Sequence, residues 1–301
     1  MSCHPTKQSS GRNEPTVTLA IVTMDRFELT VETLLQVDLT AFEEVIIVDD
    51  STDTRLEKWC RDEPITYYRG PGINMQAARN VAIERCETDV IAFVDDDVLL
   101  PSDFADRLRT AYERNPHAAA IGGPPLSSAP SRARDLCYRE RMAVSRFTGT
   151  VYDDSYRWVP EAPTSVGLLK GANMSFRRCA LEEIGGFDLR YGGASQLEET
   201  DVCVRIKAHG ELVLDPSLLC FHKQIGGSGF NQEMMEWRFR NHRYFIEKNY
   251  GLPIVYLAFI SLFIRPCGNP DSILQLLFRK LLLSQQISII GCLRAYSEGI
   301  N

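Results

Sequence analysis

The sequence predicts an α/β protein built on a mixed, mostly parallel sheet that is flanked by helices and followed by a helical extension. Short apolar and β-branched runs alternate with amphipathic segments between residues 16 and 122, which is the pattern of βαβ units. Two of the apolar runs end in clusters of aspartate. The composition, 44% apolar and 24% charged, is typical of a folded globular chain.

The hydrophobic patterns define the elements of this first region. Residues 44–48 and 90–94 are unbroken apolar runs, which predict strands buried on both faces. Residues 27–36 carry apolar side chains at helical spacing, and Pro101 favours the first turn of a further helix. Strands are predicted at 17–22, 44–48, 65–68, 90–94 and 118–121, and helices at 27–36, 55–61 and 75–86.

Residues 124–163 are rich in Arg, Ser and Pro and predict a long irregular insertion. Regular elements resume after Gly167. Strands are predicted at 168–176 and 211–214, and helices at 181–187 and 199–209.

The chain divides into three parts. Residues 1–14 are polar and lack the apolar run of a signal peptide, so they predict a disordered tail on a cytoplasmic protein. Residues 15–230 form the α/β domain. Residues 231–301 predict amphipathic helices, because the apolar run 252–264 is shorter than the ~20 residues that span a bilayer and 273–293 is interrupted by polar residues. These helices lie on a membrane surface, close over the α/β domain, or form a dimer contact.

Charge and cysteine usage exclude two classes of site. The 33 basic and 40 acidic residues give a net charge of −7, which argues against a sequence-independent nucleic-acid binder. The nine cysteines are scattered without a C-x-x-C pair, so neither a zinc site nor a redox centre is expected. We expect them to be reduced and mostly buried.

A cluster of three aspartates predicts a metal site. Asp95, Asp96 and Asp97 directly follow the apolar run 90–94. Carboxylates this close repel one another unless a cation neutralises them, and Mg²⁺ or Mn²⁺ binds one or two carboxylates together with phosphate oxygens. A metal–diphosphate complex is therefore the expected ligand. The alternative is a solvated acidic turn or helix cap.

Six motifs in a fixed order resemble the family 2 glycosyltransferases of the GT-A fold, a Rossmann-like α/β fold. The resemblance covers approximately residues 16–225 and makes 15–230 the catalytic domain. It implies a UDP-, GDP- or dTDP-sugar as donor, a divalent metal, and inversion at the anomeric carbon. The motifs are VIIVDDSTD at 45–53, AARN at 77–80, FVDDD at 93–97, GANMSF at 171–176, GGFD at 185–188 and EETDV at 198–202.

The resemblance also assigns binding residues. Asp95 and Asp97 become the metal-binding carboxylates of a D-x-D element, and His222 either completes the metal shell or is a packed core histidine. The residues assigned to the nucleotide sugar are Thr23, Asp25, Asp49, Asp50, Arg79, Asp95 and Asp96.

Transfer also requires a base for the acceptor hydroxyl. The family usually has Glu-Asp-x-Asp where this chain has E-E-T-D, which places Glu199 at the position of the base. The extra methylene of glutamate displaces the carboxylate relative to aspartate. Asp201 and Glu198 are the alternative bases, and the remaining interpretation is a set of acids that complements a helix dipole.

The expected function is that of a metal-dependent inverting hexosyltransferase that uses Mn²⁺ or Mg²⁺. The expected acceptor is a glycan or lipid-linked molecule in the assembly of cell-surface polysaccharide or glycoprotein glycans. Residues 231–301 are expected to place the chain peripherally on the inner face of the cell membrane. The alternative is a non-catalytic protein of the same fold that binds a nucleotide sugar or has a regulatory role, which Glu199 in place of aspartate favours.

Overall fold

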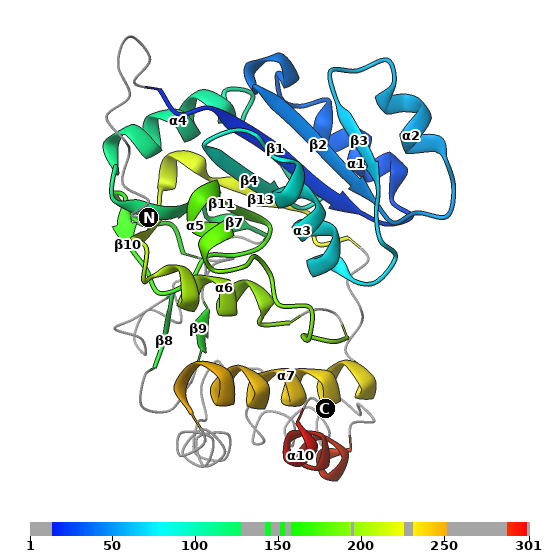
Figure 1. The fold of residues 1–301 in the computed structure, drawn as a ribbon, viewed down its shortest axis with the longest axis vertical. Coiled ribbons are helices and arrows are strands. Elements are labelled where there is room, and N and C mark those ends of the chain that lie inside the picture. Colours follow the sequence, from blue (N-terminus) through cyan, green and yellow to red (C-terminus); the bar gives the residue numbers. More distant parts are fainter. Residues whose placement is uncertain are drawn as a thin grey trace.

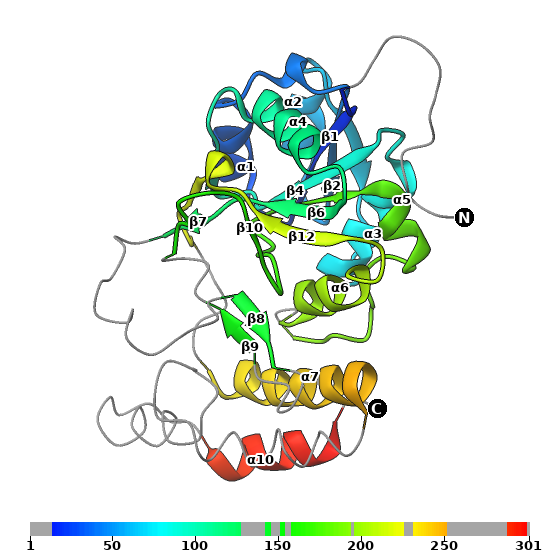
Figure 2. The same ribbon diagram turned by 90° about the vertical axis from the view of Figure 1, so that its left-hand side faces the viewer.

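The computed structural model describes residues 14–127, 142–145, 151–153, 158–193, 196–225, 231–251 and 288–299. It contains an eight-stranded sheet in the order β10-β12-β6-β11-β4-β1-β2-β3. Helices cover both faces of this sheet, and a pair of C-terminal helices lies beyond one of the helical layers (Figures 1 and 2).

The first four main strands are parallel, as predicted, and their carboxyl ends share one edge of the sheet. They are β1 (Val17–Thr23), β2 (Glu44–Asp49), β3 (Thr66–Arg69) and β4 (Val90–Val94). Side chains alternate between the two cores because the side-chain period of a strand is two: Val45 and Ile47 enter one core, and Ile46 and Val48 the other.

Six helices form the layers on the two faces of the sheet. One face packs against α1 (Phe27–Leu34), α2 (Arg55–Cys60) and α4 (Phe104–Arg114). The other packs against α3 (Met75–Arg85), α5 (Arg178–Glu183) and α6 (Glu198–Ile206). Asn74 caps α3 by accepting a hydrogen bond from Ala77 N at 2.9 Å, which satisfies one of the free amides at the start of a helix.

The second half of the sheet departs from the prediction at two strands, one that starts later than expected and one at the edge that was not expected. β11 (Asn173–Arg177) lies antiparallel between β4 and β6 (Ala118–Gly122), and β12 (Glu211–Leu214) and β10 (Thr164–Ser165) complete the edge. The strand predicted at 168–176 is wrong in its first part, because a turn in which Asn173 N donates to Lys170 O delays its start. That turn leaves residues 170–172 at the end of β4.

Two smaller sheets were not expected from the sequence. β5 (Val98–Leu99) pairs with β13 (Cys220–His222), and β13 also pairs with β7 (Pro125–Leu126). β8 (Met142–Val144) and β9 (Val151–Asp153) form a separate antiparallel pair. The pairing of His222 with Val98 brings β13 beside the aspartate cluster.

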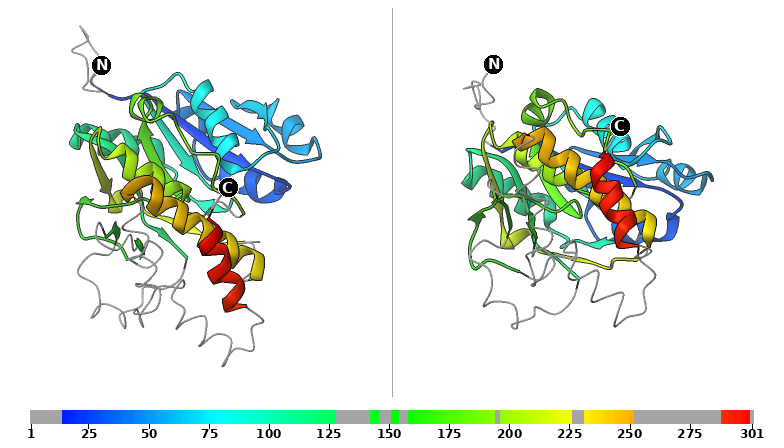
Figure 3. Two further views of the ribbon diagram at one scale, coloured as in Figure 1. Left: turned by 60° about the horizontal axis from the view of Figure 1, so that its bottom comes forward. Right: turned by 90° about the horizontal axis from the view of Figure 1, so that it is seen from below.

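The C-terminal helical extension consists, in its described part, of α7 (Gln232–Tyr250) and α10 (Ile289–Glu298). The two helices run side by side (Figure 3), and Phe239 of α7 packs edge-on against Tyr296 of α10. Among the described helices, none is long and apolar enough to cross a bilayer. The predictions for residues 1–13, for 252–264 and for most of 273–293 fall outside the described residues.

Of the six cysteines among the described residues, five follow the prediction and one does not. Free, buried thiols are found at Cys60, Cys86, Cys203, Cys220 and Cys292. Cys179, which is exposed on α5, is disulfide-bonded, so the expectation of reduced cysteines is wrong for this residue.

A charged cluster centred on Asp188 joins the turn after α5 to α7. The Asp188 carboxylate accepts from Tyr244 OH at 2.7 Å, Lys248 Nζ at 2.7 Å and the Arg190 guanidinium at 3.1 Å. Burial alone would raise the pKa of Asp188, but the hydrogen bonds from Arg190, Lys248 and Tyr244 outweigh burial and hold the pKa below its usual value. The folded state therefore stabilises the ionised form of Asp188.

We expect Asp188→Asn to flatten the dependence of stability on acid pH. Because the pKa is lower in the folded than in the unfolded chain, the stabilisation is complete above the unfolded pKa of about 4 and is lost as pH falls below it. The variant should be less stable by about 1–3 kcal/mol at pH 7, with the difference shrinking towards pH 2–3. Urea unfolding at a series of pH values measures this. Asp62→Asn, at an exposed position, is the control, and parallel curves for wild type and Asp188→Asn would contradict the assignment.

Candidate active site

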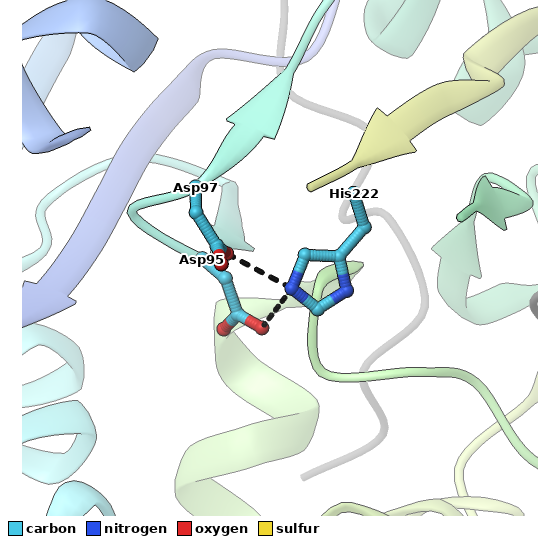
Figure 4. A group of neighbouring side chains, drawn as sticks. All are labelled: Asp95, Asp97 and His222. Atoms are coloured by element: carbon cyan, nitrogen blue, oxygen red, sulfur yellow. Dashed lines mark ion pairs between the residues drawn. The ribbon is translucent and has the colours of Figure 1, made fainter. Parts of the chain in front are cut away.

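Asp95, Asp97 and His222 form a cluster with the composition of a metal site. Asp95 and Asp97 follow β4, and β13 brings His222 to face them from the other side (Figure 4). His222 Nε2 lies 2.9 Å from Asp97 Oδ1 and 3.9 Å from Asp95 Oδ2. All three ligand atoms lie within 4.8 Å of one another.

The chemistry of these atoms and their distances from His222 fit a divalent cation. Metal–ligand bonds of about 2.1 Å place neighbouring ligands about 3 Å apart and opposite ligands about 4 Å apart, which brackets the two measured separations. Carboxylates suit Mg²⁺ and Mn²⁺, whereas an imidazole suits transition metals better than Mg²⁺. The donor set therefore fits Mn²⁺ better than Mg²⁺.

The electrostatics of the cluster favour a positive charge between the carboxylates. Burial lowers the pKa of His222, but its contact with Asp97 and the charges of Asp95 and Asp97 outweigh burial and raise the pKa overall. Burial raises the pKa of Asp95, against the opposing effects of Arg79 and His222. Either a protonated His222 or a bound cation would neutralise part of the negative charge of the two adjacent carboxylates.

The middle aspartate points away from this cluster. Asp96 Oδ2 accepts a hydrogen bond from Thr23 Oγ1 at 2.6 Å, Asp96 O accepts one from Thr33 Oγ1 at 2.9 Å, and Arg26 forms an ion pair with the Asp96 carboxylate. Burial is the main cause that raises the pKa of Asp96 to about 6. Thr23 and Asp96, which we expected at the nucleotide, thus fix the turn that carries Asp95 and Asp97.

A pocket of about 260 Å³ opens next to Asp95. Its walls come from α3, from the turn at 170–172, from the first turn of α6 and from α7. The lining residues are Met75, Arg79, Asp95, Lys170, Gly171, Ala172, Gln196, Leu197, Glu198, Glu199 and Arg238. The pocket is thus bounded by carboxylates and cations that come from distant parts of the sequence.

Two carboxylates of the E-E-T-D motif reach this pocket, each with a cationic partner. Glu199 accepts from Lys170 Nζ at 2.5 Å and from Gly171 N at 2.8 Å. Glu198 accepts from Arg79 Nη1 at 3.0 Å and is buried. Burial and the charge of Glu199 raise the pKa of Glu198 to about 7, while Arg79 opposes them.

The third acid of the motif has a different environment. Asp201 is absent from the described residues that line the pocket, and its side chain is fully buried. It accepts from Arg205 Nε at 2.7 Å, Lys248 Nζ at 2.8 Å and Asn249 Nδ2 at 2.9 Å. These contacts engage both oxygens of Asp201 on the α7 side of α6, away from the pocket.

The remaining residues expected at the nucleotide lie at the ends of β1 and β2. Asp49 is fully buried and accepts from Ser51 N and Tyr67 OH. Asp50 is half-buried and accepts from Gly72 N, whereas Asp25 is exposed and accepts from Thr52 N. Asp25 and Asp50 are therefore the accessible carboxylates of this group.

Two charged residues at the site, Arg26 and Lys170, were not predicted from the sequence. Arg26 pairs with Asp96 and also approaches Asp97 at 3.5 Å, and Lys170 holds Glu199. Lys170 directly precedes the GANMSF motif, and Arg26 follows β1 at the same sheet edge as the aspartates. Their positions beside the motifs could have indicated a role at the site. Their partners could not be predicted, because these are set by tertiary contacts.

Comparisons with solved structures agree with this architecture. GalNAc-T7 crystallised with UDP, GalNAc and Mn²⁺ superposes with a TM-score of 0.61 at 15% identity, over 90% of this chain but only 55% of that one. The mannosyltransferase PcManGT from Pyrobaculum calidifontis, in complex with GDP-Man and Mn²⁺, gives 0.57 at 18% identity over 95% of this chain and 79% of that one. TarS from S. aureus with UDP-GlcNAc gives 0.59 at 14% identity, over 94% of this chain and 80% of that one. These likenesses establish the GT-A fold.

Sequence comparison identifies the family. A glucosyl-dolichyl phosphate glucuronosyltransferase of Haloferax volcanii is 27% identical over 234 residues, which are 74% of this chain and 70% of the relative. The profile of Glycosyl transferase family 2 matches residues 22–184, more than half of the chain. The order of motifs, the GT-A architecture and this match together show that the chain belongs to glycosyl transferase family 2.

Proposed function

We propose that this chain is a Mn²⁺-dependent inverting hexosyltransferase that uses a nucleotide-diphosphate sugar. The observation that carries the proposal is the Asp95, Asp97 and His222 cluster beside a pocket that also holds the carboxylates of Glu198 and Glu199. The end at Asp95, Asp97 and His222 suits a leaving diphosphate. The carboxylates of Glu198 and Glu199 suit an incoming hydroxyl. The residues 15–230 form the catalytic domain in this proposal, and 231–301 the accessory helices.

Asp95, Asp97 and His222 hold the cation in this proposal. A divalent cation there supplies Lewis-acid stabilisation of the negative charge that develops on a diphosphate leaving group. Arg79 lies 3.7 Å from Asp95 and adds positive charge to the same side of the pocket. Asp25 and Asp50 remain available to contact the nucleotide from the ends of β1 and β2.

Glu199 is the base that the geometry supports best. An inverting transfer needs a base within hydrogen-bond reach of the acceptor hydroxyl and across the anomeric carbon from the leaving group. The Glu199 side chain keeps 13% exposure in the pocket, whereas that of Glu198 keeps 4% and is tied to Arg79. The hydrogen bonds from Lys170 and Gly171 hold the Glu199 carboxylate in place. Departure of Lys170 towards another anion would leave Glu199 free to accept a proton.

The proposed acceptor is a sugar carried on a lipid phosphate, in the assembly of a surface or glycoprotein glycan. The Haloferax volcanii relative is named for transfer to a glucosyl-dolichyl phosphate, which supports this class of acceptor and makes a UDP-uronic acid one of the donors to test. The helices of residues 231–301 are proposed to hold the chain peripherally on the inner face of the cell membrane.

Donor binding tests the proposal directly. We expect sugars on one nucleotide, among UDP, GDP and dTDP, to bind the purified chain with Mn²⁺ and to be released by a chelator. Calorimetry with each donor, including UDP-glucuronic acid, provides the measurement, and co-sedimentation with anionic phospholipid vesicles tests the proposed location. Binding that is indifferent to the chelator would refute the metal site, and absence of binding to every donor would refute the proposed activity.

A further inference from the structure

We propose that Asn241 and Lys248 of α7 are positioning residues that set the carboxylates of Glu198 and Glu199 in the pocket. The inference rests on the proposed function, since it assigns a role in the same reaction. It extends that function to the C-terminal helices, which contribute to catalysis as well as to location.

Asn241 holds the segment that precedes α6. Its side chain is fully buried on α7. Its Oδ1 accepts from Gly192 N at 3.2 Å, and its Nδ2 donates to Gly192 O at 3.0 Å and to Gln196 O at 3.0 Å. One amide thus fixes two points of the backbone that leads into Glu198.

The aromatic ring one turn earlier on α7 reinforces this contact. Trp237 packs so closely on the segment that a Cβ on Gly192 would lie 2.3 Å from its ring, and one on Gly193 would lie 2.7 Å from its side chain. Gly193 also has φ of 63°, which favours glycine. The two glycines therefore allow the backbone to approach α7, where Asn241 holds it.

Lys248 contacts the first turn of α6, on the other side of Glu198 and Glu199 from Gln196. Its Nζ donates to Asp201 at 2.8 Å and to Asp188 at 2.7 Å, while Asn249 donates to Asp201 at 2.9 Å. Asp201 is in the first turn of α6, two residues after Glu199. α7 is therefore hydrogen-bonded to α6 through the fully buried carboxylate of Asp201.

The two pocket carboxylates lie between these anchor points. Leu197, the N-cap residue immediately before α6, has φ of 77°, a conformation that is costly for a residue other than glycine and that persists only when its surroundings impose it. Anchors at Gln196 and at Asp201 provide that constraint from both sides. A shift of α7 would consequently move Glu198 and Glu199 relative to Asp95.

Substitution of Asn241 by aspartate tests the inference with little change in size. The variant loses the Nδ2 donor and presents a carboxylate to the carbonyls of Gly192 and Gln196, so the segment should move away. Because small misplacements of catalytic groups are costly, we expect kcat to fall about 10–100-fold while the affinity for donor and Mn²⁺ stays within about twofold. Hydrogen exchange should become faster in residues 196–202 and remain unchanged in β1 to β4.

Further variants keep the test decisive if this one is unstable. Lys248→Met should lower kcat in the same way, and Lys248→Arg, which keeps the charge, should recover most of it. Glu247→Gln is the matched control on the same helix, because Glu247 pairs with Arg243, also on α7, and does not line the described pocket. We expect its kcat to equal that of the wild type, with all rates measured well below each variant's Tm.

The outcomes separate this inference from the proposed function. If wild type transfers sugar and Asn241→Asp and Lys248→Met both transfer at the wild-type rate, the positioning role is overturned and the function stands. If kcat falls only in proportion to the folded fraction, α7 has a structural role alone. If wild type binds no nucleotide sugar with Mn²⁺, the proposed function and this inference fall together.

Discussion

Glu199→Gln is expected to lower the rate of sugar transfer by about 10²–10⁴-fold while Mn²⁺-dependent donor binding persists. The glutamine keeps the size of the side chain and its contact with Gly171 N, but it has no carboxylate to take the proton of an acceptor hydroxyl. Transfer measured at saturating donor and acceptor isolates this step. Calorimetric titration of the donor provides the parallel measurement of binding.

Two companion variants make this result specific to Glu199. In Gly171→Ala the new Cβ would lie 2.4 Å from Glu199 Oε2, so the carboxylate must move, and transfer should fall without any loss of charge. Glu198→Gln removes the neighbouring carboxylate, whose ion pair with Arg79 is buried. A larger loss of transfer in Glu198→Gln than in Glu199→Gln, with both chains folded, would move the base to Glu198.

Asp95→Asn should weaken Mn²⁺ binding strongly, remove most of the dependence of transfer on Mn²⁺, and lower the rate of transfer by about 10³-fold. The substitution removes a charged oxygen of the proposed ligand set, 3.9 Å from His222 Nε2, and loss of charge stabilisation at a leaving group typically costs about 10²–10³-fold in rate. Electron paramagnetic resonance of free Mn²⁺ measures the change in metal affinity. Asp95 is a clean target because its carboxylate makes few contacts that hold the fold.

Asp96→Asn is the contrasting change one residue away. Asp96 contacts Thr23 and Arg26 and faces away from the ligand cluster, so this variant should retain Mn²⁺ binding and lose stability instead. Equal losses of Mn²⁺ affinity in the two variants would show that the measurement reports general damage to the turn. Wild-type Mn²⁺ affinity in Asp95→Asn would remove Asp95 from the ligand set.

The parts of the site that the sequence predicted are those that local patterns determine. Unbroken apolar runs end at Asp49 and Asp95, and a parallel sheet brings the carboxyl ends of such strands to one edge. The order of motifs then pointed to Asp95 and Asp97 as metal ligands and to the E-E-T-D motif as the source of a base. Hydrophobic periodicity and motif order thus indicated which side chains lie at this edge of the sheet, while their roles as ligands and base stay predictions.

Other features depend on contacts between distant segments and left little local signal. His222 faces Asp97 because β13 pairs with β5, two short strands whose residues give no strong strand pattern. The three acids of E-E-T-D look equivalent in the sequence, yet Asp201 faces α7 while Glu198 and Glu199 face the pocket. The three side chains leave the first turn of α6 in different directions. Which of them meets α7 and which meets the pocket depends on where α7 packs, and the sequence does not indicate this.

The antiparallel insertion of β11 between β4 and β6 has a consequence for biosynthesis. As the chain leaves the ribosome, β1 to β4 and their helices are complete well before β11 emerges, so one edge of the buried strand β4 lacks its neighbour. An unpaired apolar edge is a template for association with other nascent chains. We therefore expect the partly synthesised chain to be exposed to such association until residues 173–177 are made, the segment that joins the two halves of the sheet and anchors the turn beside the pocket.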